Sequence, residues 1–146
     1  MATRHLLRLI VVQSLFEWFF NERKENLKDI FERNLKNFAS DVQDPEFGYR
    51  LVEGIENKLP EIESRIMKYA HSQWPVEEIP LINLSILRLG IYELLFSDPK
   101  EVPPKVAINE AVELASILSN EEAVKFINGV LASVYKEKYG PESNPL

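Results

Sequence analysis

Apolar residues recur three or four positions apart along most of the chain, which is the spacing of amphipathic helices. The chain has only five glycines, and no Asn-Gly or Asp-Gly turn lies between runs of alternating polarity, so nothing indicates β-hairpins. The pattern predicts seven helices and no strands. Their expected positions are about residues 3–21, 25–39, 45–59, from 60 towards Trp74, 81–96, 103–118 and 120–139.

Polar residues and prolines set the expected helix starts. Asp44 followed by Pro45 has the form of an N-cap and a first-turn proline for the third helix. Ser119 and Glu122 have the spacing of a capping box before the seventh helix. The second helix is expected to bury one stripe, made of Leu27, Ile30, Phe31, Leu35 and Phe38.

The first and fifth helices are apolar on nearly all sides, which is typical of helices that are surrounded by others. We therefore expect each of them to lie at the centre of its own small helical bundle. This predicts an all-α, single-domain protein with two packed subdomains, at about residues 1–59 and 60–139. Residues 140–146 are expected to form a flexible tail.

Composition narrows the function classes. The 146 residues are 45% hydrophobic and 27% charged, as in one globular domain. The net charge of −6 excludes nucleic-acid binding through bulk positive charge, so any RNA site must be a local basic patch. The apolar run from Leu6 to Phe20 is interrupted by polar residues and is too short to cross a membrane. The absence of cysteine is compatible with a reducing cytoplasm.

No arrangement of residues indicates catalysis. The two histidines, His5 and His71, are far apart in the sequence, and neither has nearby cysteines or carboxylates at metal-ligand spacing. No glycine-rich phosphate loop is present, and no nucleophile is paired with a base. We therefore expect no enzyme activity, no metal and no cofactor.

The basic residues near the N-terminus have two interpretations. Arg4 and Arg8 are four positions apart and share one face of the first helix, with His5 beside them. They can clamp the phosphates of single-stranded RNA, or they can be the solvated end of a buried helix. Spacing alone leaves both interpretations open.

A second basic group is expected at the starts of the last two helices. Lys105 lies in the first turn of the sixth helix and Lys125 in the second turn of the seventh, where both can face an anionic backbone. Phe126 lies off the apolar stripe of its helix. It can stack on a nucleobase or pack in the core, and the sequence favours neither.

Three motifs together resemble one family. They are residues 102–115 (VPPKVAINEAVELA) with residues 125–131 (KFINGVL), residues 12–18 (VQSLFEW) and residues 87–94 (LRLGIYEL). From about Thr3 to Tyr139, the chain resembles the NusB family of bacterial transcription antitermination factors. The resemblance implies two helical bundles side by side. It also implies binding of boxA-like single-stranded RNA together with NusE, within the RNA polymerase elongation complex on ribosomal RNA operons.

The resemblance also suggests residue roles. The implied RNA-binding residues are Arg4, His5, Arg8, Lys105, Glu122, Lys125 and Phe126. The implied NusE-binding residues are Phe16, Asn83 and Glu93, although simple core packing is an alternative for Phe16. Many members of the family carry a longer arginine cluster than Arg4 and Arg8, so fewer phosphate contacts are expected here. Some members are dimeric when free, and a homodimer could hide the arginine face.

Two alternatives to this function remain. NusB-like domains also occur as the N-terminal part of ribosomal-RNA cytosine methyltransferases, so the chain can be a stand-alone RNA-targeting domain. The acidic charge and the short arginine cluster also fit a protein-interaction module that has lost RNA binding.

Overall fold

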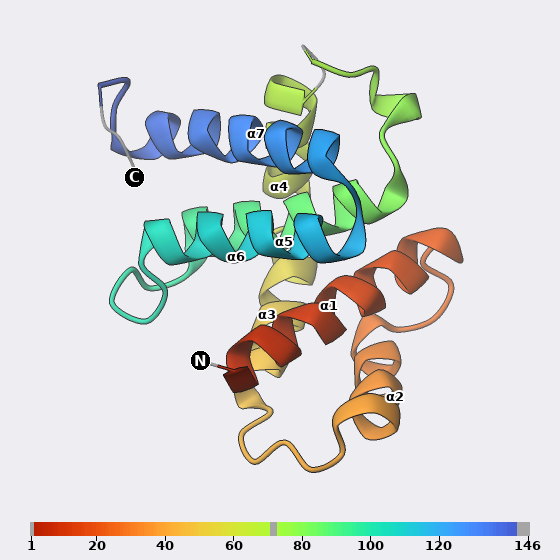
Figure 1. Cartoon of the computed structure of the whole chain (residues 1–146). Helices are drawn as coiled ribbons and strands as arrows, with labels where there is room; N and C mark the ends of the chain where they lie inside the picture. The colour runs from red at the N-terminus through yellow and green to blue at the C-terminus, as the bar shows by residue number, and fades with distance from the viewer. Residues whose placement is uncertain (1, 71–72, 143–146) are drawn as a thin grey trace.

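The computed structural model describes residues 2–70 and 73–142, so His71 and the last four residues of the expected tail lie outside the described part. Within the described residues the chain is all-helical, with no strand, which confirms the predicted fold class (Figure 1). The helices are α1 (Ala2–Phe20), α2 (Leu27–Ala39), α3 (Glu46–Asn57), α4 (Leu59–Arg65), α5 (Leu81–Phe96), α6 (Pro104–Leu118) and α7 (Glu121–Tyr139). A π-helical turn (Ile66–Ala70) extends α4, and a short 3-10 turn (Val76–Glu78) precedes α5.

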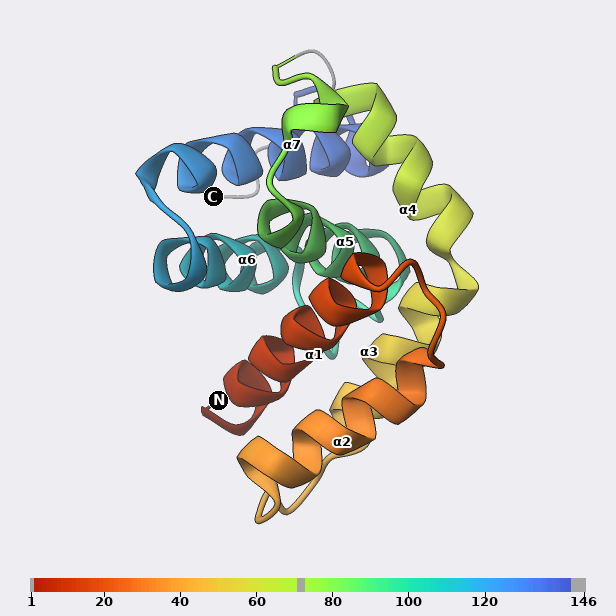
Figure 2. The ribbon, with the colours of Figure 1, turned by 90° about the vertical axis from the view of Figure 1, so that its right-hand side faces the viewer.

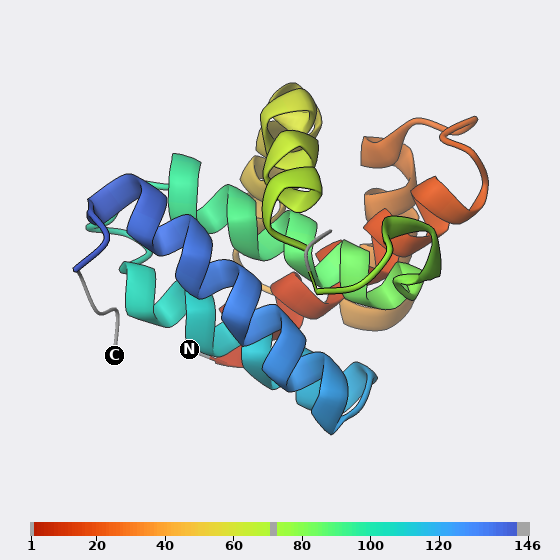
Figure 3. The ribbon, with the colours of Figure 1, turned by 90° about the horizontal axis from the view of Figure 1, so that it is seen from above.

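The two helices that were expected to be surrounded by others, α1 and α5, lie at the centre of the packing. α1 packs against α2, α3 and α5, and Figure 2 shows α1 between α2 and α5. α5 also packs against α3, α4, α6 and α7, and the view from above shows α6 and α7 running beside it (Figure 3). α1 and α5 are apolar on nearly all sides because other helices pack against them on several sides. The division into subdomains at residues 1–59 and 60–139 stays a prediction.

Two predicted helix caps are wrong. The N-cap of α7 is Asn120, whose side-chain oxygen accepts a hydrogen bond from the Ala123 amide at 2.8 Å. Ser119 instead ends α6, so it does not form the expected capping box. At α3 the residue before the first turn is Pro45, with no side-chain cap from Asp44. In each case the chain begins its helix one residue later than the motif indicated.

The buried face of α2 differs from the predicted stripe in its last turns. Leu27, Ile30 and Phe31 are buried as expected, but Phe38 is 62% exposed. The buried positions there are Asn34 and Ala39 instead. Asn34 donates hydrogen bonds from its amide to the Ser14 hydroxyl at 3.1 Å and to the Glu17 carboxylate at 3.0 Å, both on α1. The face of α2 that packs against α1 therefore includes Asn34, whose buried amide has hydrogen-bond partners there, and the ring of Phe38 lies in solvent.

No helix in the described part of the chain is both long enough and apolar enough to cross a membrane.

Candidate RNA and partner surfaces

Arg8 and Glu93 form a buried ion pair between α1 and α5. The guanidinium donates from Nε to one carboxylate oxygen and from Nη2 to the other, each at 2.9 Å. The two side chains are only 2% and 1% exposed. Burial raises the pKa of Glu93, and the hydrogen bonds and charge of Arg8 oppose that shift. In this conformation neither residue reaches the surface, although the sequence suggested an RNA contact for Arg8 and a partner contact for Glu93.

Glu110 on α6 continues this network towards the surface. One of its oxygens accepts from Nη1 of Arg8 at 3.1 Å, and the other lies 3.0 Å from Nδ1 of His5. Among the described residues, His5, Glu110 and Glu113 also bring possible metal-ligand atoms within 4.8 Å of one another. Both Glu110 oxygens already have hydrogen-bond partners in this network, Arg8 and His5.

A second charged group lies at the start of α1, around the ring of Phe47 on α3. Arg4 donates to the backbone carbonyl of Glu101 at 3.0 Å and to its carboxylate at 3.3 Å. Arg50, from α3, donates to the same carboxylate oxygen at 2.6 Å. The Arg4, Arg8 and Arg50 guanidinium carbons lie 4.3, 4.9 and 5.9 Å from the centroid of the Phe47 ring. Three arginines therefore gather at one place, two of them on α1.

Sequence reasoning missed Arg50. It lies 46 positions after Arg4, and no spacing rule relates residues on different helices. The only local signal is that Arg50 is a basic residue three positions after Phe47 on α3, and residues at this spacing are neighbours on a helix surface.

The two candidate lysines lie at the surface. Lys105 in the first turn of α6 and Lys125 in the second turn of α7 are both exposed. Neither belongs to an ion pair within the described part of the chain, so both ammonium groups are available to an anion. Glu122, in the first turn of α7, is also exposed. Its position at a helix start is favourable for an acidic side chain whether or not it contacts RNA.

Phe126 packs in the core and is only 6% exposed. Trp74, in the segment before α5, meets it edge to face at a centroid distance of 5.2 Å. Trp74 is itself partly exposed. The two rings, with Gln73, Glu122 and Lys125, line a hollow of about 330 Å³. In this hollow Trp74 is the more accessible aromatic ring, and Phe126 supports it from below.

An apolar hollow lies beside Phe16 on α1. Its volume is about 270 Å³, and its lining residues are Leu9, Gln13, Phe16, Ile82 and Leu118. The Phe16 ring is stacked on Phe20, with centroids 5.9 Å apart, and Phe20 is 69% exposed. Phe16 is therefore part of an accessible apolar surface, and it is only partly packed into the core.

Asn83, the other suggested partner residue, is buried near the start of α5. Its side-chain oxygen has no hydrogen-bond partner in the described part of the protein. The structure therefore brings Phe16 to the surface, whereas Asn83 and Glu93 lie beneath it.

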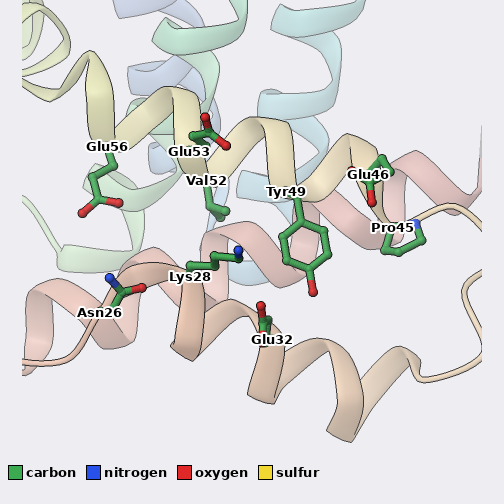
Figure 4. A pocket seen from close by; sticks show the side chains of 9 residues that line it. All are labelled: Asn26, Lys28, Glu32, Pro45, Glu46, Tyr49, Val52, Glu53 and Glu56. Atoms are coloured by element: carbon green, nitrogen blue, oxygen red, sulfur yellow. The ribbon is translucent and has the colours of Figure 1, made fainter.

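A hollow of about 710 Å³ lies between α2 and α3 and is acidic (Figure 4). Its lining includes Glu32, Glu46, Glu53 and Glu56, with Lys28 as the one cation among the lining residues. Burial, together with the charges of Glu32 and Glu46, raises the pKa of the Tyr49 hydroxyl in this hollow. The negative charge of this hollow is unfavourable for a polyanion, so the hollow is not a candidate RNA surface.

Comparison with known proteins gives one family. The model of the NusB family matches residues 5–136. The chain is 38% identical over 135 residues to the transcription antitermination protein NusB of Dehalococcoides mccartyi strain 195, covering 92% of this chain and 91% of that protein. It is 37% identical over 148 residues to the protein of the same name from Solibacter usitatus, covering 99% and 97%.

Solved structures agree with these relatives. A NusB crystal structure from T. maritima superposes with a TM-score of 0.78 at 33% identity, covering 96% of this chain and 97% of that chain. A crystal structure of the antitermination factors NusB and NusE in complex with double-stranded RNA matches with a TM-score of 0.78 at 27% identity, covering 94% and 98%. The likeness extends over nearly the whole chain in both cases.

Proposed function

The chain belongs to the NusB family, and on that premise we propose that it is a transcription antitermination factor that binds boxA-like single-stranded RNA together with NusE. It acts by binding and not by catalysis. In this role the protein and NusE join the RNA polymerase elongation complex in the cytoplasm, chiefly on ribosomal RNA operons, and suppress premature termination.

One observation carries the proposal. The chain matches, over 94% of its length, a NusB protein that was crystallised with NusE and RNA. The charge distribution supports it, because the molecule is acidic overall and yet has exposed lysines at the starts of α6 and α7 and a partly exposed arginine, Arg4, at the start of α1. Arg4, Lys105 and Lys125 would position the RNA backbone, while stacking on an accessible ring such as Trp74 would add base preference.

The apolar hollow beside Phe16 supports a protein partner on α1. The hollow is lined almost entirely by apolar side chains, and the exposed ring of Phe20 stacks on Phe16 beside it, so exposed apolar side chains gather at this place. We propose that NusE covers it and that the buried Arg8–Glu93 pair contributes indirectly by fixing α1 on α5. Self-association through the same patch would give a homodimer in the absence of NusE.

The proposal is tested by fluorescence anisotropy of a labelled boxA-type RNA, titrated with the protein with and without its NusE, at two salt concentrations. The expected result is salt-sensitive binding that becomes tighter with NusE. The logarithm of the binding constant should fall linearly with the logarithm of the salt concentration, with a slope of about 0.7 for each phosphate that the protein neutralises. The slope therefore reports the number of phosphate contacts. Binding that does not differ between boxA-type RNA and a scrambled RNA would contradict the proposal.

A second candidate is a protein-interaction module without RNA binding. The observation in its favour is that both arginines at the start of α1 are already paired within the protein. Arg8 is buried against Glu93, and Arg4 is paired with Glu101. The same titration separates the two functions. If NusE binds while the RNA stays free at low salt, the module is the correct description.

A further inference from the structure

We infer that Arg50 on α3 is a further RNA-phosphate contact, and that the Glu101 carboxylate occupies, in the free protein, the place that an RNA phosphate takes in the complex. The inference rests on the proposed function. It adds Arg50 of α3 to Arg4 of α1 as part of the RNA surface. Arg4 and Arg50 would hold one phosphate between them. Glu101 would compete with RNA for both of them.

The geometry is that of an anion site formed by three separate segments. One carboxylate oxygen of Glu101 accepts from Arg50 at 2.6 Å and from Arg4 at 3.3 Å. Arg4 comes from α1, Arg50 from α3, and Glu101 from the loop between α5 and α6. The guanidinium carbons of both arginines lie over the Phe47 ring, which gives them a common support.

The chemistry of this site fits a phosphodiester. A guanidinium presents planar N–H donors that match the oxygens of carboxylates and phosphates alike, so a carboxylate between two arginines stands where a phosphate can stand. Two positive charges face the single negative charge of Glu101. Displacement of that carboxylate would therefore expose both arginines to the RNA backbone.

The site can open without rearrangement of the fold. The backbone of the loop is held by the Asp98 carbonyl, which accepts from the amides of Glu101 at 2.9 Å and Val102 at 2.8 Å. The Glu101 and Arg50 side chains are 39% and 56% exposed, so the Glu101 side chain can turn into solvent while its backbone stays fixed. Exposed ion pairs contribute little to stability, so a polyanion that makes several contacts at once can displace this carboxylate.

The variants Glu101→Gln and Arg50→Gln, each of which replaces a charged side chain by a neutral one, test the inference in the RNA titration with NusE present. Each phosphate contact contributes a salt slope of about 0.7, which at 0.1 M salt corresponds to about fivefold in affinity. Because Arg4 still contacts the shared phosphate, Arg50→Gln should weaken binding by up to about fivefold and lower the slope by up to about 0.7. Glu101→Gln should tighten binding by up to about fivefold, and in the Arg50→Gln background this gain should shrink.

Glu137→Gln is the matched control for Glu101→Gln. Glu137 on α7 also accepts from an arginine, Arg65, at 2.9 Å, and from Lys68 at 3.5 Å. Its removal changes the net charge by the same amount at a place that lacks the predicted RNA residues. RNA affinity should therefore change much less than in Glu101→Gln.

The outcomes separate this inference from the proposed function. If Arg4→Gln weakens RNA binding while Arg50→Gln and Glu101→Gln leave it unchanged, the RNA function stands and the inference is wrong. If the wild type binds RNA weakly and Glu101→Gln binds it tightly, the inference is supported directly. If neither the wild type nor Glu101→Gln binds RNA at low salt, both are wrong.

Discussion

Arg8 and Glu93 are joined by two parallel hydrogen bonds of 2.9 Å, inside an interface that excludes nearly all solvent from both side chains. They lie 85 positions apart in the sequence and fix the first turns of α1 against the last turns of α5. A charge in such a place is tolerated only while its partner is present. The pair is therefore a structural joint between α1 and α5.

Removal of one member of this pair should be strongly destabilising. Glu93→Ala leaves the Arg8 guanidinium buried with only Glu110 as a partner, and the expected loss is about 3–5 kcal/mol in the free energy of unfolding. The double variant Arg8→Met with Glu93→Leu should lose clearly less than the sum of the losses in Arg8→Met and Glu93→Leu, because neither charge of the buried pair then remains without the other. Glu110 loses Arg8 in Arg8→Met and in the double variant alike, so this loss does not enter the coupling. Urea unfolding measures both, and additive losses would contradict the coupling.

Gly48 on α3 should not tolerate a side chain. A Cβ atom at this position would lie 2.5 Å from Cζ of Phe31, whose ring is fully buried. Overpacking of this kind costs about 1–3 kcal/mol, whereas the better helix propensity of alanine returns at most about 1 kcal/mol. Gly48→Ala should therefore lower the free energy of unfolding.

Gly129→Ala on α7 is the control for that substitution. There a Cβ atom would be 3.6 Å from the Gln73 amide, which is an ordinary contact distance. With no overpacking, the propensity gain of up to about 1 kcal/mol should dominate. Thermal unfolding of both variants should show shifts of opposite sign, and a stabilised Gly48→Ala would show that Phe31 can move aside.

The helices were largely predictable from the sequence because their signals are local. The expected ranges agree closely with the observed helices, and α5 begins and ends at the predicted residues, Leu81 and Phe96. Apolar spacing and prolines act within one or two turns and need no knowledge of the tertiary fold. The errors came where two local signals compete, as at Ser119 and Asn120, either of which can cap α7.

The candidate site was less predictable, because its features depend on contacts between distant segments. The four-residue spacing of Arg4 and Arg8 correctly indicates a shared helix face, but it cannot show that Glu93 buries one of them and Glu101 pairs with the other. The same limit hid Arg50. A sequence gives the charges on each helix, whereas the sum of charges at one place depends on which helices meet there.

Glu137 should contribute stability that depends on pH. The hydrogen bond from the Tyr69 hydroxyl, and then Arg65 and Lys68, hold the pKa of this carboxyl below its usual value of 4.5. A lowered pKa in the folded state stabilises the fold above the unfolded-state pKa, and this contribution disappears as the pH falls through the folded-state pKa. The wild type should therefore be more stable than Glu137→Gln at pH 7, by up to about 1 kcal/mol. Urea unfolding should show this difference shrinking below pH 4.5, and a difference independent of pH would contradict it.

Phe16 should contribute to NusE binding far more than its exposure alone suggests, if the apolar hollow of α1 is the NusE surface as proposed. Phe16→Ala removes the aromatic wall of that hollow, and a central aromatic contact of this kind contributes about 2 kcal/mol or more, so NusE affinity should fall about thirtyfold. Phe38→Ala is the matched control, since Phe38 is an equally large ring at an exposed position of α2. Isothermal titration with NusE should show a loss in the first variant only. If the two variants bind NusE with equal affinity, NusE binds elsewhere, because a partner that buried this hollow would lose affinity when the Phe16 ring is removed.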